Sequence, residues 1–101
     1  MGTVSVLLVL QLPGVQSLKA KRAVVRSLVA RLRSRLELSA AEVGAQDLLQ
    51  RAEVGFAVVS ADLTTARRVA DEARRFADQE LLGRAEVVAV HVAETVVRSA
   101  D

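Results

Sequence analysis

The residues best suited to chemistry in this 101-residue chain are cations gathered in one segment. Between positions 17 and 36 there are seven Lys and Arg side chains and no Asp or Glu. They are Lys19, Lys21, Arg22, Arg26, Arg31, Arg33 and Arg35. The whole chain has a net charge of only +2, so this segment is far more basic than the rest. A local surplus of positive charge is suited to binding the phosphates of RNA or DNA.

The element that must position these cations is a helix, which we predict over residues 18–36 with Ser17 as its N-cap. Apolar residues recur at helical spacing along one stripe: Leu18, Val25, Leu28, Val29, Leu32 and Leu36. In a helical projection four cations follow one flank of this stripe: Lys19, Arg22, Arg26 and Arg33. Lys21 and Arg35 fall on the other flank, and Arg31 lies nearer the back. The predicted nucleic-acid contacts are Lys19, Lys21, Arg22, Arg26 and Arg33.

Internal pairing is an alternative explanation of the basic segment. Like charges four residues apart, such as Arg22 and Arg26, destabilise a helix by about 0.2–0.5 kcal/mol per pair. Either an anionic partner or acids elsewhere in the fold must offset this repulsion. The candidate acids are Glu37, Glu42, Glu53 and those of a second helix.

The rest of the chain offers little for catalysis. His91 is the single histidine and cysteine is absent, which excludes a cysteine nucleophile and a multi-histidine metal site within one chain. The five glycines are too scattered for a phosphate-binding loop, and no spacing pairs two carboxylates for acid–base work. We therefore expect no enzyme activity, no metal and no cofactor. An enzyme that uses His91 or Asp47 is the least favoured alternative.

The hydrophobic periods predict a single domain, residues 1–101, with the order β-α-β-β-α-β. The expected strands cover residues 3–12, 38–43, 53–60 and 84–95, and a second helix starts at Asp62 or Thr64 and runs to Leu82. A loose tail is expected over Val96–Asp101. Right-handed crossovers then give a ferredoxin-like α+β sandwich, with a four-stranded antiparallel sheet and two helices on one face.

One face of this sheet should remain open. Trp and Tyr are absent, and Phe56 and Phe76 are expected in the core, so stacking of RNA bases on the sheet is not expected. The open face instead offers small and apolar residues, which is typical of a contact surface. We predict a homodimer joined through Leu7, Val9, Ala57 and Val59, and a small ligand between the subunits is a further possibility.

The segment from Gly44 to Arg51 is a polar connection between two strands. Gln46, Asp47, Gln50 and Arg51 could serve recognition, as polar loops often do. The alternative is structural: Asp47 caps a helical turn, and Arg51 pairs with Asp47 or Glu53.

Composition also bears on location and source. Apolar runs reach only five or six residues, and the start lacks the features of an export signal, so we expect a cytoplasmic protein without a membrane partner. Arg outnumbers Lys twelve to two and Asn is absent, which leaves both a thermophilic source and a GC-rich genome open.

Three blocks of the sequence resemble one family. The run from Leu12 to Arg22, LPGVQSLKAKR, resembles the PG-x-x-SLK-x-KR start of the YlxP-like bacterial proteins. Residues 41–43, 46–47, 50–52 and 55–60 resemble the rest of the family pattern, so the similarity covers residues 1–95. Leu49 departs from it, where an aromatic residue is expected, and so does Gly44, where an acid is common.

The resemblance implies a ferredoxin-like domain of unknown function, encoded near translation-initiation and ribosome-maturation genes. It therefore favours contact with RNA or the ribosome. The family's marked positions are Ser17, Leu18, Lys19, Lys21, Arg22, Gln46, Asp47, Gln50 and Arg51. Lys19, Lys21 and Arg22 would contact phosphate. Gln46, Asp47 and Arg51 would serve recognition or hold the hairpin together.

Overall fold

The computed structural model describes residues 1–100 and has the predicted order of elements. The strands are β1 (Gly2–Gln11), β2 (Ser39–Gly44), β3 (Arg51–Ser60) and β4 (Glu86–Val96). The helices are α1 (Leu18–Leu36) and α2 (Leu63–Leu81). The predicted bounds of α1 are confirmed, and the other elements differ by one or two residues. The expected loose tail begins with the last residue of β4, and Asp101 lies outside the described residues.

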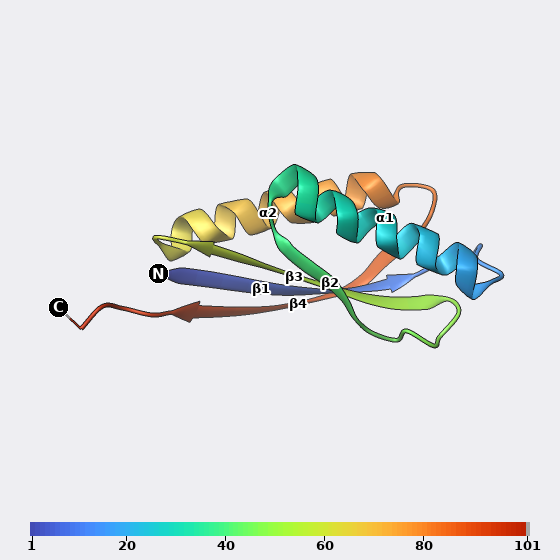
Figure 1. Ribbon diagram of the computed structural model, residues 1–101, viewed down its shortest axis with the longest axis horizontal. Coiled ribbons are helices and arrows are strands. Elements are labelled where there is room, and N and C mark those ends of the chain that lie inside the picture. The colour runs from blue at the N-terminus through green and yellow to red at the C-terminus, as the bar shows by residue number, and fades with distance from the viewer. Residues whose placement is uncertain (101) are drawn as a thin grey trace.

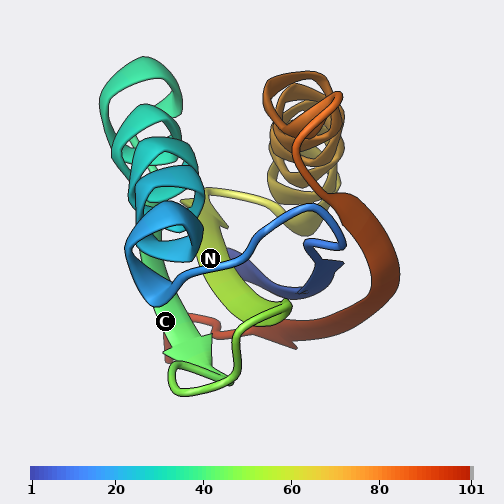
Figure 2. The same cartoon turned by 90° about the vertical axis from the view of Figure 1, so that its right-hand side faces the viewer.

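The strands form one antiparallel sheet in the order β2-β3-β1-β4. Both helices cover the same face of it, α1 on the β2 side and α2 on the β4 side (Figure 1, Figure 2). The ferredoxin-like prediction is therefore confirmed, with β1 and β3 as the inner strands. Neither helix within residues 1–100 is long and apolar enough to cross a membrane.

The core lies between the sheet and the helices. Alternate side chains of β1 point into it, and the four from Val4 to Leu10 are at most 6% exposed. In α2 the buried side chains are Ala66, Ala70, Ala73, Ala77 and Leu81. Phe76, expected in the core, is only half-buried at the margin of this face, and so is Val69. Alanine on this face lets α2 approach the sheet closely.

Capping residues mark the ends of the helices. The Ser17 Oγ accepts a hydrogen bond from the Ala20 N–H at 3.1 Å, which makes Ser17 the N-cap of α1. Asp62 caps α2 in the same way, accepting from the Thr65 N–H at 2.7 Å. Gly83 follows α2 with φ of 76°, a left-handed conformation that glycine adopts without strain.

The Asp62 cap predicts a pH-dependent stability. Hydrogen bonds from Thr65 hold the pKa of the Asp62 carboxyl below its usual value of 3.8. Because the folded pKa is the lower one, the ionised cap stabilises the fold above pH 3.8, and this contribution is lost as the pH falls through the folded pKa. We expect Asp62→Asn, which keeps an acceptor oxygen but cannot titrate, to lose stability less steeply than wild type in acid. Urea unfolding at a series of pH values measures this, and identical slopes would contradict it.

Candidate nucleic-acid interface

Four exposed cations follow the outer flank of α1, and we call them the basic flank: Lys19, Arg22, Arg26 and Arg33. The Arg33 Nε donates to the Ala40 carbonyl oxygen of β2 at 2.8 Å. Since β2 is an edge strand, this bond places the flank at the margin of the molecule. Figure 2 shows α1 over that margin, away from α2.

Acidic neighbours neutralise little of this charge. Arg31, on the side of α1 that faces α2, pairs with Glu80 at 2.9 Å. Within residues 1–100 the structure shows no ion pair to a carboxylate for five helix cations: Lys19, Arg22, Arg26, Arg33 and Arg35. Pairing with an acid therefore explains Arg31. In the basic flank the Arg33 Nε is already bonded to Ala40, and Lys19, Arg22 and Arg26 remain available to an anion.

Lys21 is placed differently from the prediction. Its side chain is 1% exposed, and its Nζ donates to the carbonyl oxygens of Ala45 at 2.5 Å, Leu48 at 2.7 Å and Gln46 at 3.3 Å. The Glu42 carboxylate lies 3.8 Å away. An ammonium has three protons, so the three carbonyls use all of its donors. The prediction that Lys21 contacts phosphate is therefore wrong, because the group is buried and fully bonded.

The helical spacing contains a signal for this burial. Lys21 precedes Val25 by four residues and Leu28 by seven, so it belongs to the apolar stripe and not to its flank. The sequence gives no indication of the acceptors, which lie 24 to 27 residues further along the chain.

The loop between β2 and β3 depends on these bonds. Ala45 has φ of 57°, a left-handed conformation that is unfavourable for a residue with a Cβ. The Ala45 carbonyl is one of the three that bind the Lys21 ammonium. Residues 45–50 form turns and bends, so the helical turn that Asp47 was expected to cap is not present.

Gln50 joins the same loop to the turn after β1. Its side-chain amide donates to the carbonyl oxygens of Pro13 at 3.3 Å and Val15 at 3.2 Å. Its backbone carbonyl accepts from the Leu12 N–H at 2.9 Å. Gln50 thus acts as a structural clasp between two loops.

The other polar loop residues, Gln46, Asp47 and Arg51, are exposed. In residues 1–100 Arg51 forms no ion pair with Asp47 or Glu53. The Lys21 bond to the Gln46 carbonyl brings this loop beside the first turns of α1. Gln46 and Asp47 therefore lie beside the start of α1, whereas Arg51 lies at the start of β3 with Val9 and Val88.

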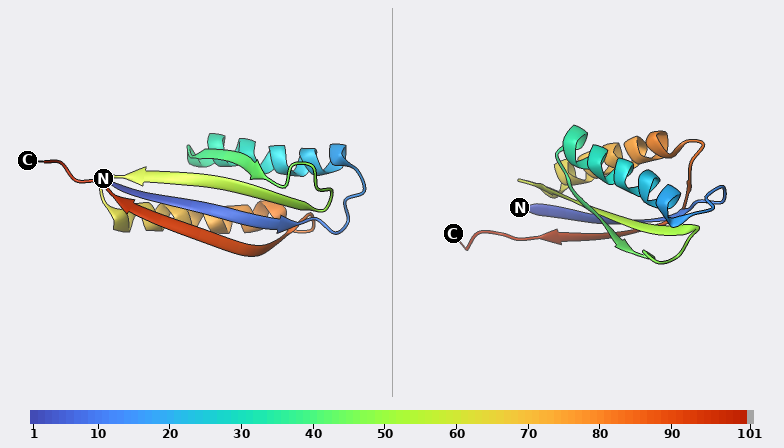
Figure 3. Two further views of the ribbon diagram at one scale, coloured as in Figure 1. Left: turned by 90° about the horizontal axis from the view of Figure 1, so that it is seen from below. Right: turned by 45° about the vertical axis from the view of Figure 1, so that its right-hand side comes forward.

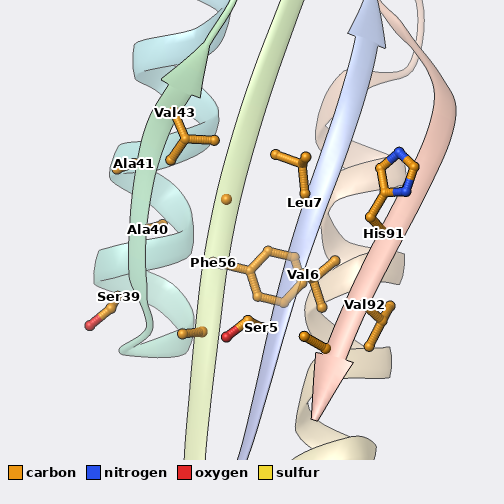
Figure 4. Close-up of a pocket in the computed structure, with 13 residues that line it drawn as sticks. Ser5, Val6, Leu7, Ser39, Ala40, Ala41, Val43, Phe56, His91 and Val92 are labelled. Atoms are coloured by element: carbon orange, nitrogen blue, oxygen red, sulfur yellow. The ribbon is translucent and has the colours of Figure 1, made fainter.

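The open face of the sheet has a floor of small residues: Ser5, Ser39, Ala41, Gly55, Ala57 and Ala93. The larger Val43, Leu7 and His91 side chains lie toward one end of it (Figure 4), and the hollow has a volume of about 550 Å³. A Cβ on Gly55 would lie 3.3 Å from the Val43 Cγ1, so this glycine leaves room for Val43. The view from below in Figure 3 shows this face unobstructed by either helix.

The predicted dimer residues differ in accessibility. Leu7 and Ala57 line the hollow and are half-buried, and Val59 is 65% exposed. Val9 is only 4% exposed, which corrects its assignment to an interface. Val9 lies where the register between β1 and β4 shifts. Together with Val88 and the end of the β2–β3 loop it lines a second, smaller hollow.

His91 lies on the open face in register with Leu7 and is exposed. It is the one titratable side chain that lines the hollow described above. Within residues 1–100 there is no group of three or more His, Asp or Glu side chains placed to hold a metal ion.

Residues 3–92 match a family described as "Protein of unknown function (DUF503)". The chain belongs to this family. Two structures of the Arabidopsis thaliana protein At3g17210 are similar over 98% of the chain. An ensemble-refined crystal structure has 19% identity, 98% of its own chain covered and a TM-score of 0.49. A solution structure has 20% identity, 90% covered and a TM-score of 0.48. No curated protein matches the sequence.

The burial of Lys21 predicts a large loss of stability on its removal. We expect Lys21→Met to lower the free energy of unfolding by about 1–3 kcal/mol, because it removes the donor of three part-buried hydrogen bonds. Lys19→Met, two residues away on the exposed flank, is the matched control and should change it by less than about 0.5 kcal/mol. Urea unfolding measures both, and equal effects would contradict the structural role of Lys21.

Proposed function

We propose that this protein is a non-catalytic accessory protein of the cytoplasm that binds RNA through the basic flank of α1. The observation that supports this most directly is a row of exposed cations without acidic partners among the described residues. The choice of RNA, and of the ribosome as its setting, rests on the resemblance to the YlxP-like group.

The dimensions of the flank suit a phosphate backbone. Lys19 and Arg33 are fourteen residues apart, which is about 21 Å along a helix. Cations at intervals over this length can contact several successive phosphates. The flank also lies at the margin of the molecule, beside the edge strand β2, so single-stranded RNA can approach it without displacing other parts of the fold.

The contacts available would be largely independent of base sequence. Both Phe residues are buried or half-buried, and Trp and Tyr are absent, so no exposed aromatic ring stands beside the flank for a base to stack on; the exposed imidazole of His91 lies on the open face of the sheet. Lys and Arg at the flank can bind phosphate oxygens, and these contacts position a protein on RNA but do not read sequence. The exposed Gln46 and Asp47, in the loop that binds Lys21, are side chains beside α1 that could add hydrogen-bond recognition.

Reversing the charge of the flank should abolish RNA binding. The variant combines Lys19→Glu, Arg22→Glu and Arg26→Glu, and the measurement is fluorescence anisotropy with a labelled oligouridine and a labelled RNA hairpin. For wild type we expect log Kd to rise with log salt with a slope of about 2 to 4, as for three or four phosphate contacts.

A control variant separates the effect of the flank from the effect of the net charge. Arg75→Glu, Arg84→Glu and Arg98→Glu together also move the net charge from +2 to −4, but at exposed positions outside α1. This variant should retain most of the affinity at moderate salt. Unchanged binding by the α1 variant, with its circular dichroism intact, would end the RNA proposal.

A second candidate function is a structural or regulatory homodimer that packs open face against open face. The observation that favours it is the relief of that face, where the larger Leu7, Val43 and His91 side chains lie beside a floor of small residues. The larger side chains of one copy fit over the small floor of another, which gives the self-complementarity that a two-fold interface requires.

A substitution that places a charge among the small residues of the open face tests this packing. Wild type should sediment at twice the 10.8 kDa of the chain, and Ala57→Glu should yield the monomer because a carboxylate buried between two sheets has no partner. Ala61→Glu, in the exposed turn before α2, is the matched control and should remain a dimer. A dimer that survives Ala57→Glu is not held together by this face.

A further inference from the structure

The two edges of the sheet are protected very differently. β2, at one edge, has six residues, and its register shifts between Glu42 and Gly44. The Ala40 carbonyl, which points away from β3, already accepts the bond from Arg33. A short strand, a bulge and a covering cation are ways in which proteins prevent an edge from pairing with another chain.

β4, at the other edge, has one of these protections, a register shift at Val88, and no bulge or covering cation over the stretch from Ala89 to Ala93. It has eleven residues, and every residue from His91 to Val96 is exposed. The stretch from Val87 to Ala93 contains no proline, glycine, lysine, arginine or acid. Glu94, two residues before the end of β4, is paired with Arg67 at 2.6 Å. An apolar stretch of edge strand without protection is an open template for strand pairing.

The hydrogen bonds at the chain ends show which backbone groups of β4 are free. Met1 and Val97 exchange two hydrogen bonds, of 2.8 and 2.9 Å, so they form a bonded pair between β1 and the end of β4. Bonded and non-bonded pairs alternate in an antiparallel ladder. With the register of β1 and β4, the backbone groups that point to β1 belong to Ala89, His91, Ala93 and Thr95. Those that point away from the sheet belong to Val90, Val92, Glu94 and Val96.

We propose that the outer edge of β4 pairs with β4 of a second copy of this chain. Each of the four outward residues offers one N–H and one C=O, which is a continuous row of donors and acceptors for an antiparallel partner. Because the β2 edge is covered, a head-to-tail β4–β2 contact that would extend into a filament is blocked. Two β4 edges related by a two-fold axis pair with each other and close the assembly.

This pairing joins two sheets into one of eight strands. The order would be β2-β3-β1-β4 followed by the same strands of the second copy in reverse. Both helix layers then lie on one side, and both open faces lie on the other. The two basic flanks end up at opposite outer margins, so the edge contact does not depend on RNA binding and differs from face-to-face packing.

Amide hydrogen exchange of the native protein, followed by NMR, tests the pairing residue by residue. In a lone sheet the inward amides of His91 and Ala93 are protected, and the outward amides of Val92 and Glu94 exchange freely. Edge pairing predicts that the outward amides are also protected, at least about tenfold, and that this protection falls on dilution. Free exchange of the outward amides at concentrations where the protein is dimeric would overturn the proposal.

A proline variant gives a second measurement with a matched control. Val92→Pro removes an outward N–H while leaving the ladder to β1 intact, since proline is tolerated where an edge N–H faces solvent. Val92→Thr keeps the N–H and the branched side chain. Sedimentation should give a monomer for the proline variant and a dimer for the threonine variant.

The same experiment separates the edge from the open face. A dimer lost in Ala57→Glu but kept in Val92→Pro would overturn edge pairing and leave the face-to-face candidate. A dimer lost in Val92→Pro but kept in Ala57→Glu would support edge pairing alone. A wild-type monomer at all concentrations would overturn edge pairing, and it would leave the RNA proposal to its own binding assay.

Discussion

The contact on which the candidate site depends is the bond of the buried Lys21 ammonium to three carbonyls of the β2–β3 loop. A charge taken out of water is tolerated only when its donors are satisfied. Here the loop must therefore keep its shape, including the left-handed Ala45, for α1 to lie against the sheet. The ammonium thus fixes the start of α1 and the loop relative to each other, and with them the exposed side chains on both.

The position of α1 at the β2 side of the sheet follows from the crossover connections and has two consequences. Arg33 reaches the Ala40 carbonyl and covers one edge of the sheet, while the remaining cations of the flank face solvent. At the other side α2 leaves the last six residues of β4 exposed on both faces. One helix layer therefore produces a basic margin, an open apolar face and an unprotected edge, and each suits a different kind of partner.

The fold could be predicted from local patterns because each element carries its own period and its own cap. The predicted bounds of α1 are confirmed because Ser17 caps it and its apolar stripe is continuous. The site was less predictable. Lys21 and Lys19 are the same residue type two positions apart, yet one is 1% exposed and the other faces solvent. Val9, apolar like its neighbours on the open side of β1, is buried at the point where β4 shifts its register.

The sequence by itself determined the order of elements, the helix caps and the concentration of cations in α1, because these depend on residues close together in the chain. The tertiary structure decided which cations are free, since Lys21 and Arg33 find acceptors and Arg31 finds an acid in elements distant in sequence. It also decided which edge of the sheet is covered. Contacts between residues far apart in the chain form only when the elements pack, and no local pattern records them.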